Sequence, residues 1–140
     1  MKVIRVPAEK SKRPNLKNQE IGTIRAYNPN RKIALPTMEG LSFERIKEII
    51  CLEAKGNYTL IHFTEGKKQL VCRTLRDMED MLYNDRRFAR IHRSHTVNLD
   101  YLQKYIKGKG GYVILEGGMN ISVSSGRKQS FMDAITLYFR

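Results

Sequence analysis

Several features that would each define a class of protein are scarce or missing in this sequence. Only two of the 140 residues are cysteine, Cys51 and Cys72, too few for a disulfide scaffold or a thiolate metal site. No apolar run approaches the roughly 20 residues that a membrane-spanning helix needs. The basic N-terminus is not followed by the continuous apolar stretch of a secretory signal. We therefore expect a cytoplasmic protein with free thiols and no membrane contact.

Positive charge, by contrast, is abundant and unevenly distributed, with a formal net charge of +12. Residues 1–32 contain nine Lys/Arg and two acidic residues, residues 33–85 contain seven and nine, and residues 86–128 contain nine and two. A basic second half suggests a surface for a polyanion, because Lys and Arg that neutralise phosphates release condensed counterions. The alternative, equally weighted on charge alone, is that these side chains only confer solubility.

The composition divides the chain into two parts. Residues 1–31 contain three of the four prolines and few large apolar side chains, which predicts a flexible basic arm or linker. Residues 32–140 have the apolar patterning of one globular domain, and their length suffices to bury a core.

Short segments rich in β-forming residues dominate this domain. Gly117 and Gly118 separate the last two and predict a hairpin turn that requires positive φ. The predicted strands are 33–35, 49–54, 58–63, 68–73, 104–108, 111–116 and 119–124. Such a pattern indicates a mainly β fold with short helices.

Three helical segments are expected between these strands. Thr74 and Asp77 form a capping box ahead of an apolar stripe, which is the strongest helix signal in the chain. Ser42 precedes one or two predicted helical turns, with Glu44 near their positive end. Ser124 and Ser125 are predicted to cap a final helix, whose apolar face contains Phe131, Ile135 and Tyr138.

Three segments in register are similar to one known family. They are the EA-x-G-NY turn at 53–58, the F-x-R-x-H-R-S-x-x-VN segment at 88–98, and the I-x-VS segment at 121–124. Together they resemble the LytTR DNA-binding domain, with the similarity covering roughly residues 32–135. The resemblance implies elongated antiparallel sheets whose loops, rather than a recognition helix, enter successive major grooves of duplex DNA.

The resemblance also implies which side chains meet DNA. Arg93 offers a fork of donors suited to guanine N7 and O6 or to phosphate. The family's Val-Ser-Arg pattern is altered here, because Ser125 and Gly126 separate Ser124 from Arg127, and the sequence leaves open whether Arg127 replaces that arginine. The expected DNA-binding residues are Lys55, Asn57, Tyr58, His92, Arg93, Ser94, Ser124, Arg127 and Lys128.

No pattern favours an enzyme, a cofactor or a metal. His92 and His95 invite a zinc site, but no Cys, Asp or Glu lies at ligand spacing nearby. Ser125 and Lys128 match a Ser-x-x-Lys pattern without its supporting motifs. Asn98 is expected to be structural, since an Asn at a turn often bonds its own backbone.

The family resemblance has further implications for partners. Many members follow a receiver domain in two-component response regulators, so this chain is expected to be a stand-alone member or an excised output domain. Members bind imperfect direct repeats, which implies two protomers on one site. The rival interpretation is a signalling or scaffold module of the same fold that binds a protein or ligand. Single-stranded nucleic acid binding is a third, supported only by Tyr58. The basic second half favours duplex DNA.

Overall fold

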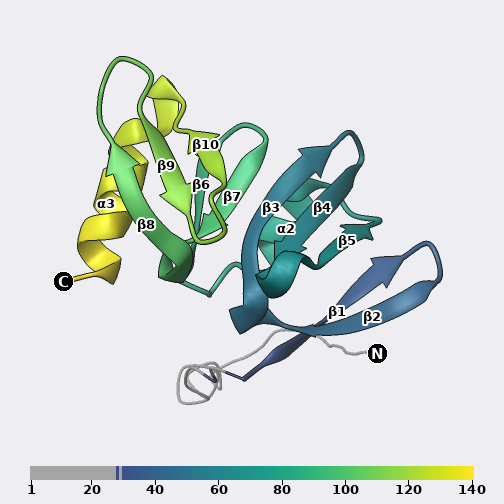
Figure 1. The fold of residues 1–140 in the computed structure, drawn as a ribbon. Helices are drawn as coiled ribbons and strands as arrows, with labels where there is room; N and C mark the ends of the chain where they lie inside the picture. The colour runs from purple at the N-terminus through teal and green to yellow at the C-terminus, as the bar shows by residue number, and fades with distance from the viewer. Residues whose placement is uncertain (1–27, 29) are drawn as a thin grey trace, which may run out of the picture.

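The computed structural model describes residue 28 and residues 30–140, so the predicted basic arm, residues 1–31, lies almost entirely outside the described part (Figure 1). Within that part the fold is mainly β with short helices, as predicted. The strands are β1 (Lys32–Thr37), β2 (Gly40–Arg45), β3 (Ile49–Lys55), β4 (Tyr58–Phe63), β5 (Lys68–Val71), β6 (Phe88–His92), β7 (His95–Asn98), β8 (Leu102–Ile106), β9 (Tyr112–Leu115) and β10 (Asn120–Ser122). The helices are α2 (Leu75–Met81) and α3 (Lys128–Tyr138).

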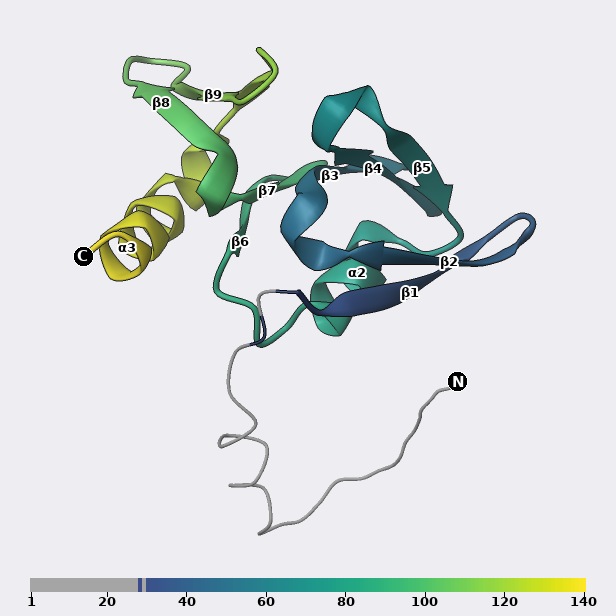
Figure 2. The same cartoon turned by 60° about the horizontal axis from the view of Figure 1, so that its bottom comes forward.

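The strands form three antiparallel sheets. β1 and β2 form a hairpin, a five-stranded sheet has the order β5-β4-β3-β7-β6, and a three-stranded sheet has the order β10-β9-β8. Figures 1 and 2 show α2 and the β1–β2 hairpin against the β3–β5 half of the large sheet. The small sheet and α3 lie beside β6 and β7 (Figure 2). The result is an elongated arrangement of two packed halves.

Strand β3 contributes to two hydrophobic cores. Ile49 and Leu52 belong to the first core, with α2 and the hairpin, whereas Ile50 and Cys51 belong to the second, with α3 and the small sheet. Coverage of both faces explains why this segment is a continuous apolar run rather than an alternating one. Burial raises the pKa of the Cys51 thiol to about 12, so this thiol stays protonated at neutral pH.

The strongest helix signal is confirmed by α2. The hydroxyl oxygen of Thr74 accepts a hydrogen bond from the backbone N–H of Asp77 at 3.1 Å. Leu75, Met78 and Leu82 are buried in the first core, as the apolar stripe predicts. The Gly117–Gly118 turn is also confirmed, with φ values of 91° and 87°.

Two helix predictions need correction. The segment after Ser42 is helical only in part, because β2 continues to Arg45 and pairs with β1 along its whole length, which places Glu44 in a strand. A single 3₁₀ turn over Ile46–Glu48 then follows in place of the predicted α-helical turns. Ser124 and Ser125 do not cap the last helix. A 3₁₀ turn over Ser125–Arg127 intervenes and α3 begins at Lys128 without a side-chain cap. The predicted apolar face is confirmed, since Phe131 is buried in the second core.

Candidate nucleic-acid interface

Three of the predicted DNA-binding segments lie at one end of the molecule, the upper edge in Figure 1. The β3–β4 and β6–β7 turns are adjacent because β3 and β7 pair antiparallel, with Glu53 opposite His95. The backbone N–H of Ala54 donates to the carbonyl of Ser94 at 2.8 Å, which joins the two turns directly. The segment between β10 and α3 joins them through Ser124, whose N–H donates to the carbonyl of Ile91 at 2.9 Å.

The β3–β4 turn carries Lys55, Asn57 and Tyr58, all exposed. Glu53 lies beneath them and accepts from His62 at 2.9 Å, while its other oxygen lies 3.2 Å from the Lys55 ammonium. Burial would raise the pKa of Glu53, but the bonds from His62 and Lys55 outweigh it and hold that pKa below its usual range. A carboxylate charge therefore sits among the cations of this end and offsets part of the charge of Lys55.

The β6–β7 turn presents His92, Arg93 and Ser94. The N–H of Ser94 donates to Nδ1 of His92 at 3.1 Å, so Nδ1 is an acceptor and the ring can donate outward through Nε2. Arg93 is exposed, and its guanidinium bonds to none of the residues that the structure describes. It is therefore available for an external acceptor such as a guanine edge or a phosphate.

The third segment holds Ser124, Arg127 and Lys128. The hydroxyl of Ser124 lies 3.5 Å from the carbonyl of Ile91, so this side chain faces the protein rather than a helix end. Arg127 precedes α3 and is half-buried, whereas Lys128 begins the helix and is exposed. Both cations therefore lie at the N-terminus of α3, where backbone N–H groups can also hold phosphate.

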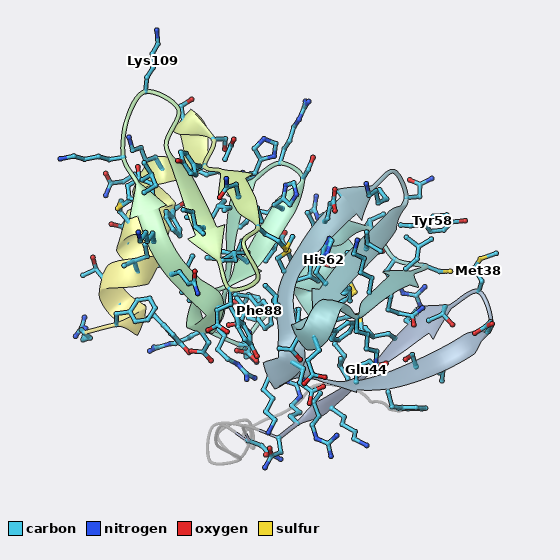
Figure 3. All side chains as sticks on the ribbon, viewed as in Figure 1. Met38, Glu44, Tyr58, His62, Phe88 and Lys109 are labelled. Atoms are coloured by element: carbon cyan, nitrogen blue, oxygen red, sulfur yellow. The ribbon has the colours of Figure 1, made fainter. Side chains whose placement is uncertain are left out.

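A fourth loop at this end, between β8 and β9, is absent from the DNA-binding residues expected from the sequence. The β8–β9 loop is tied to the interface by a 2.9 Å bond from the N–H of Val123 to the carbonyl of Gly111. Lys107 and Lys109 are exposed on it, and neither forms an ion pair with the residues that the structure describes. Figure 3 shows Lys109 extending away from the loop. The Lys-Gly-Lys-Gly-Gly composition was the available signal for a phosphate-contacting loop.

Other cations of the basic half serve the protein itself. Arg87 is buried and its guanidinium lies 2.7 Å from Asp85. Arg90 binds Glu79 and backbone carbonyls. Arg86 precedes β6 and so lies at the opposite end of that strand from the turn. The cations on the four loops of this end are Lys55, Arg93, Lys107, Lys109, Arg127 and Lys128.

Asn98 and the two histidines of the β6–β7 segment interact with other parts of the protein. Asn98 is fully buried, donates to the carbonyl of Ile49 at 2.8 Å and accepts from the N–H of Asp100 at 2.9 Å, so its structural interpretation is confirmed. The rings of His92 and His95 pack edge to face at 5.7 Å. Over residues 28 and 30–140, no group of three His, Cys, Asp or Glu side chains is placed to hold a metal ion. No helix in that part is both long and apolar enough to cross a membrane.

Comparison with known proteins shows which family of proteins this chain resembles. Residues 39–136 match the model of the LytTr DNA-binding domain. A curated relative, the CO-responsive transcriptional regulator RcoM of Rhodospirillum rubrum, is 32% identical over 100 residues, which cover 71% of this chain and 42% of that protein. The chain thus spans less than half the length of this relative.

A solved structure agrees with the fold. The LytTr DNA-binding domain of a Bacillus cereus protein superimposes with a TM-score of 0.63 at 20% identity, covering 74% of this chain and 95% of that one. These findings define a DNA-binding regulatory domain. The chain belongs to the LytTR family.

Proposed function

We propose that this chain binds duplex DNA in a sequence-specific manner and serves as the output domain of a transcriptional regulator. The β3–β4 turn, the β6–β7 turn and the β10–α3 segment enter successive major grooves, while the lysines of the β8–β9 loop contact phosphate. Arg93 reads a base edge, and His92 and Ser94 contact bases or phosphates beside it. Lys55, Asn57, Tyr58, Ser124, Arg127 and Lys128 complete the contact set.

The observation that carries this proposal is the clustering of cations where backbone bonds join the loops. Among the residues that the structure describes, all of these cations except Lys55 lack an ion pair. Ala54 bonds Ser94, Ser124 bonds Ile91, and Val123 bonds Gly111, so the loops belong to one connected framework. A framework held by backbone hydrogen bonds can keep its donors in the positions that base-edge recognition demands. Cations that merely conferred solubility would have no reason to gather there.

The partners follow from the same proposal. Two protomers occupy one imperfect direct-repeat site, and a sensor or receiver domain supplies the signal in the cytoplasm. RcoM, the relative described above, is a CO-responsive transcriptional regulator, and the matched segment covers only 42% of it. We infer that a comparable sensor acts on the present domain, as a separate protein or as part of the same polypeptide.

The decisive experiment is selection of duplexes from a random DNA pool by the full chain, followed by gel shifts with excess competitor DNA. We expect a recurring motif that resists competition by scrambled duplex. Retention on heparin without any enriched motif would leave only general polyanion binding. Failure on both would favour the rival signalling or scaffold module. Preference for the single strand of the same sequence would favour single-stranded binding.

A further inference from the structure

Arg90, on strand β6, makes an unusual set of bonds beneath the β6–β7 turn. Its Nε donates to the carbonyl of His92 at 2.8 Å, and its Nη2 donates to the carbonyl of Arg93 at 2.6 Å. The third nitrogen, Nη1, donates to Glu79 of α2 at 2.8 Å. All three guanidinium nitrogens are thus engaged inside the protein, and this cation is not free for phosphate.

These bonds leave the turn with little freedom. The carbonyls of His92 and Arg93 accept from Arg90, and the carbonyl of Ser94 accepts from the N–H of Ala54. Three consecutive carbonyls at the tip therefore have defined partners. The Arg93 guanidinium, by contrast, is exposed and has no bond to the residues that the structure describes.

Glu79 extends this arrangement to the other half of the molecule. One of its oxygens binds Arg90, and the other accepts from the hydroxyl of the buried Thr96 at 3.3 Å. The side chains of Arg90 and Glu79 are only 22% and 32% exposed, so water competes weakly for their charges. Because Glu79 lies on α2 and the turn lies between β6 and β7, one ion pair links the first core to the proposed DNA-reading tip.

We propose that Arg90, held by Glu79, is the positioning residue that fixes the direction of Arg93 and thereby sets base selectivity. The proposal rests on the proposed DNA-binding function and deepens it. Arg90 itself touches no DNA. It acts through the carbonyls on either side of the residue that does, and a lysine cannot replace it, since one ammonium cannot span three acceptors in this fork geometry.

The test compares Arg90→Lys, Glu79→Gln and Arg93→Ala with the unmodified chain, using a duplex selected by that chain and a scrambled duplex. We expect Arg90→Lys, which keeps the charge, to lose roughly tenfold affinity for the selected duplex, within the range that a misplaced base contact costs. Affinity for the scrambled duplex and the thermal unfolding midpoint should change little. The matched control is Glu44→Gln, which removes the acid of the 2.7 Å ion pair with Lys67, distant from the loop end.

Coupling between the residues gives a second criterion. The double variant Arg90→Lys/Arg93→Ala should bind the selected duplex no more weakly than Arg93→Ala alone, because a missing side chain cannot be misdirected. Losses that multiply, or equal losses on both duplexes, would overturn the proposal by making Arg90 an independent or merely structural contributor.

A DNA-free measurement separates failure of this inference from failure of the proposed function. In ¹⁵N NMR spectra of the unmodified chain we expect the Arg90 Nε–H to exchange slowly with water. In spectra of Glu79→Gln we expect the amide signals of Arg93 and Ser94 to be displaced. Fast exchange and unmoved signals overturn the positioning role even if the chain binds DNA. If those signals behave as expected but the unmodified chain selects no duplex, Arg90 does position the β6–β7 turn. The proposal that this turn reads DNA is then overturned.

Discussion

Ser124 and Ile91 are joined by a backbone hydrogen bond of 2.9 Å at the point where β6 bulges. Arg90 pairs with Thr96 and His92 with His95, so Ile91 has no cross-strand partner in β7. Its carbonyl accepts instead from the N–H of Ser124, two residues after β10. A β-bulge thereby couples two of the proposed DNA-binding segments, which lie more than thirty residues apart in the chain. We therefore expect the interface to behave as one unit.

DNA affinity should depend steeply on salt. Six cations lie on the four loops of this end, and among the described residues only Lys55 has an ion-pair partner. If about five of them contact phosphate, the log–log slope of affinity against salt should be about −4 to −5. Replacing both Lys107 and Lys109 by Gln should make that slope shallower by about 2. Fluorescence anisotropy across a salt series measures both. A slope near zero would exclude phosphate contact.

Substitutions of Arg93 and Lys128 should affect specific and non-specific DNA binding differently. Arg93→Ala should weaken binding to the selected duplex more than to a scrambled one, because a bidentate base contact is worth ~1–3 kcal/mol of discrimination. Lys128→Ala should weaken both similarly, since a phosphate contact carries no sequence information. Gel-shift titrations of the two duplexes provide the comparison. Equal losses for Arg93→Ala would reassign it to the DNA backbone.

Removing the Glu53 charge should strengthen DNA binding. Glu53→Gln keeps the shape of the side chain and one of its two acceptor oxygens. It removes the negative charge next to Lys55, so affinity for both duplexes should rise roughly two- to fivefold, the scale of one partly exposed ion pair. Glu116→Gln, in the β9–β10 turn at the other end, is the control, and it should raise DNA affinity less. A loss confined to the selected duplex would mean that Glu53 itself reads a base.

Stability should fall as the solution becomes mildly acidic. Burial lowers the pKa of His95 below its ordinary 6.5, with His92, His62 and Lys55 adding to that effect and Glu53 opposing it. The unfolded chain therefore takes up a proton before the folded one does, and the stabilisation present above pH 6.5 is lost as the pH falls below it. Urea midpoints at a series of pH values should show this loss, and His95→Asn should reduce it. An unchanged profile in that variant would place the effect elsewhere.

Deleting residues 1–31 should weaken DNA binding without changing the preferred sequence. This segment carries eight Lys/Arg and two acidic residues, and such charge adds counterion release and faster encounter, both independent of sequence. Affinities of the full and truncated chains should converge at high salt. If the truncated chain selects a different motif, the arm reads a groove, and if nothing changes at low salt it is a passive linker.

The sequence predicts well those elements whose determinants are local. The capping box at Thr74 and the apolar stripe behind it are properties of neighbouring residues, and α2 forms where they indicate. The segment after Ser42 has equally local helix signals, yet its first residues pair with the preceding strand β1 in a hairpin, and only Ile46–Glu48 form a helical turn. A capping signal taken along one segment does not register its pairing with a neighbouring strand.

The site shows the same division. The turns that carry Asn57 and Arg93 could be recognised from motifs, and their adjacency follows from the β3–β7 pairing. The role of Arg90 could not be recognised from a motif, because it depends on Glu79 of α2. Glu79 lies eleven positions earlier in the chain and is brought close only by the fold. Charge counting over residues 86–128 likewise included Arg87, whose guanidinium is committed to Asp85.

Strand β3 restricts how this domain can change. Because Leu52 fills one core and Cys51 the other, inserting a single residue into this strand would send each side chain to the wrong side and displace the two turns attached to its end. The residues at the tips of the turns pack in neither core. New DNA preferences can therefore arise by exchanging side chains at the tips, while the strand that spaces those tips must keep its length.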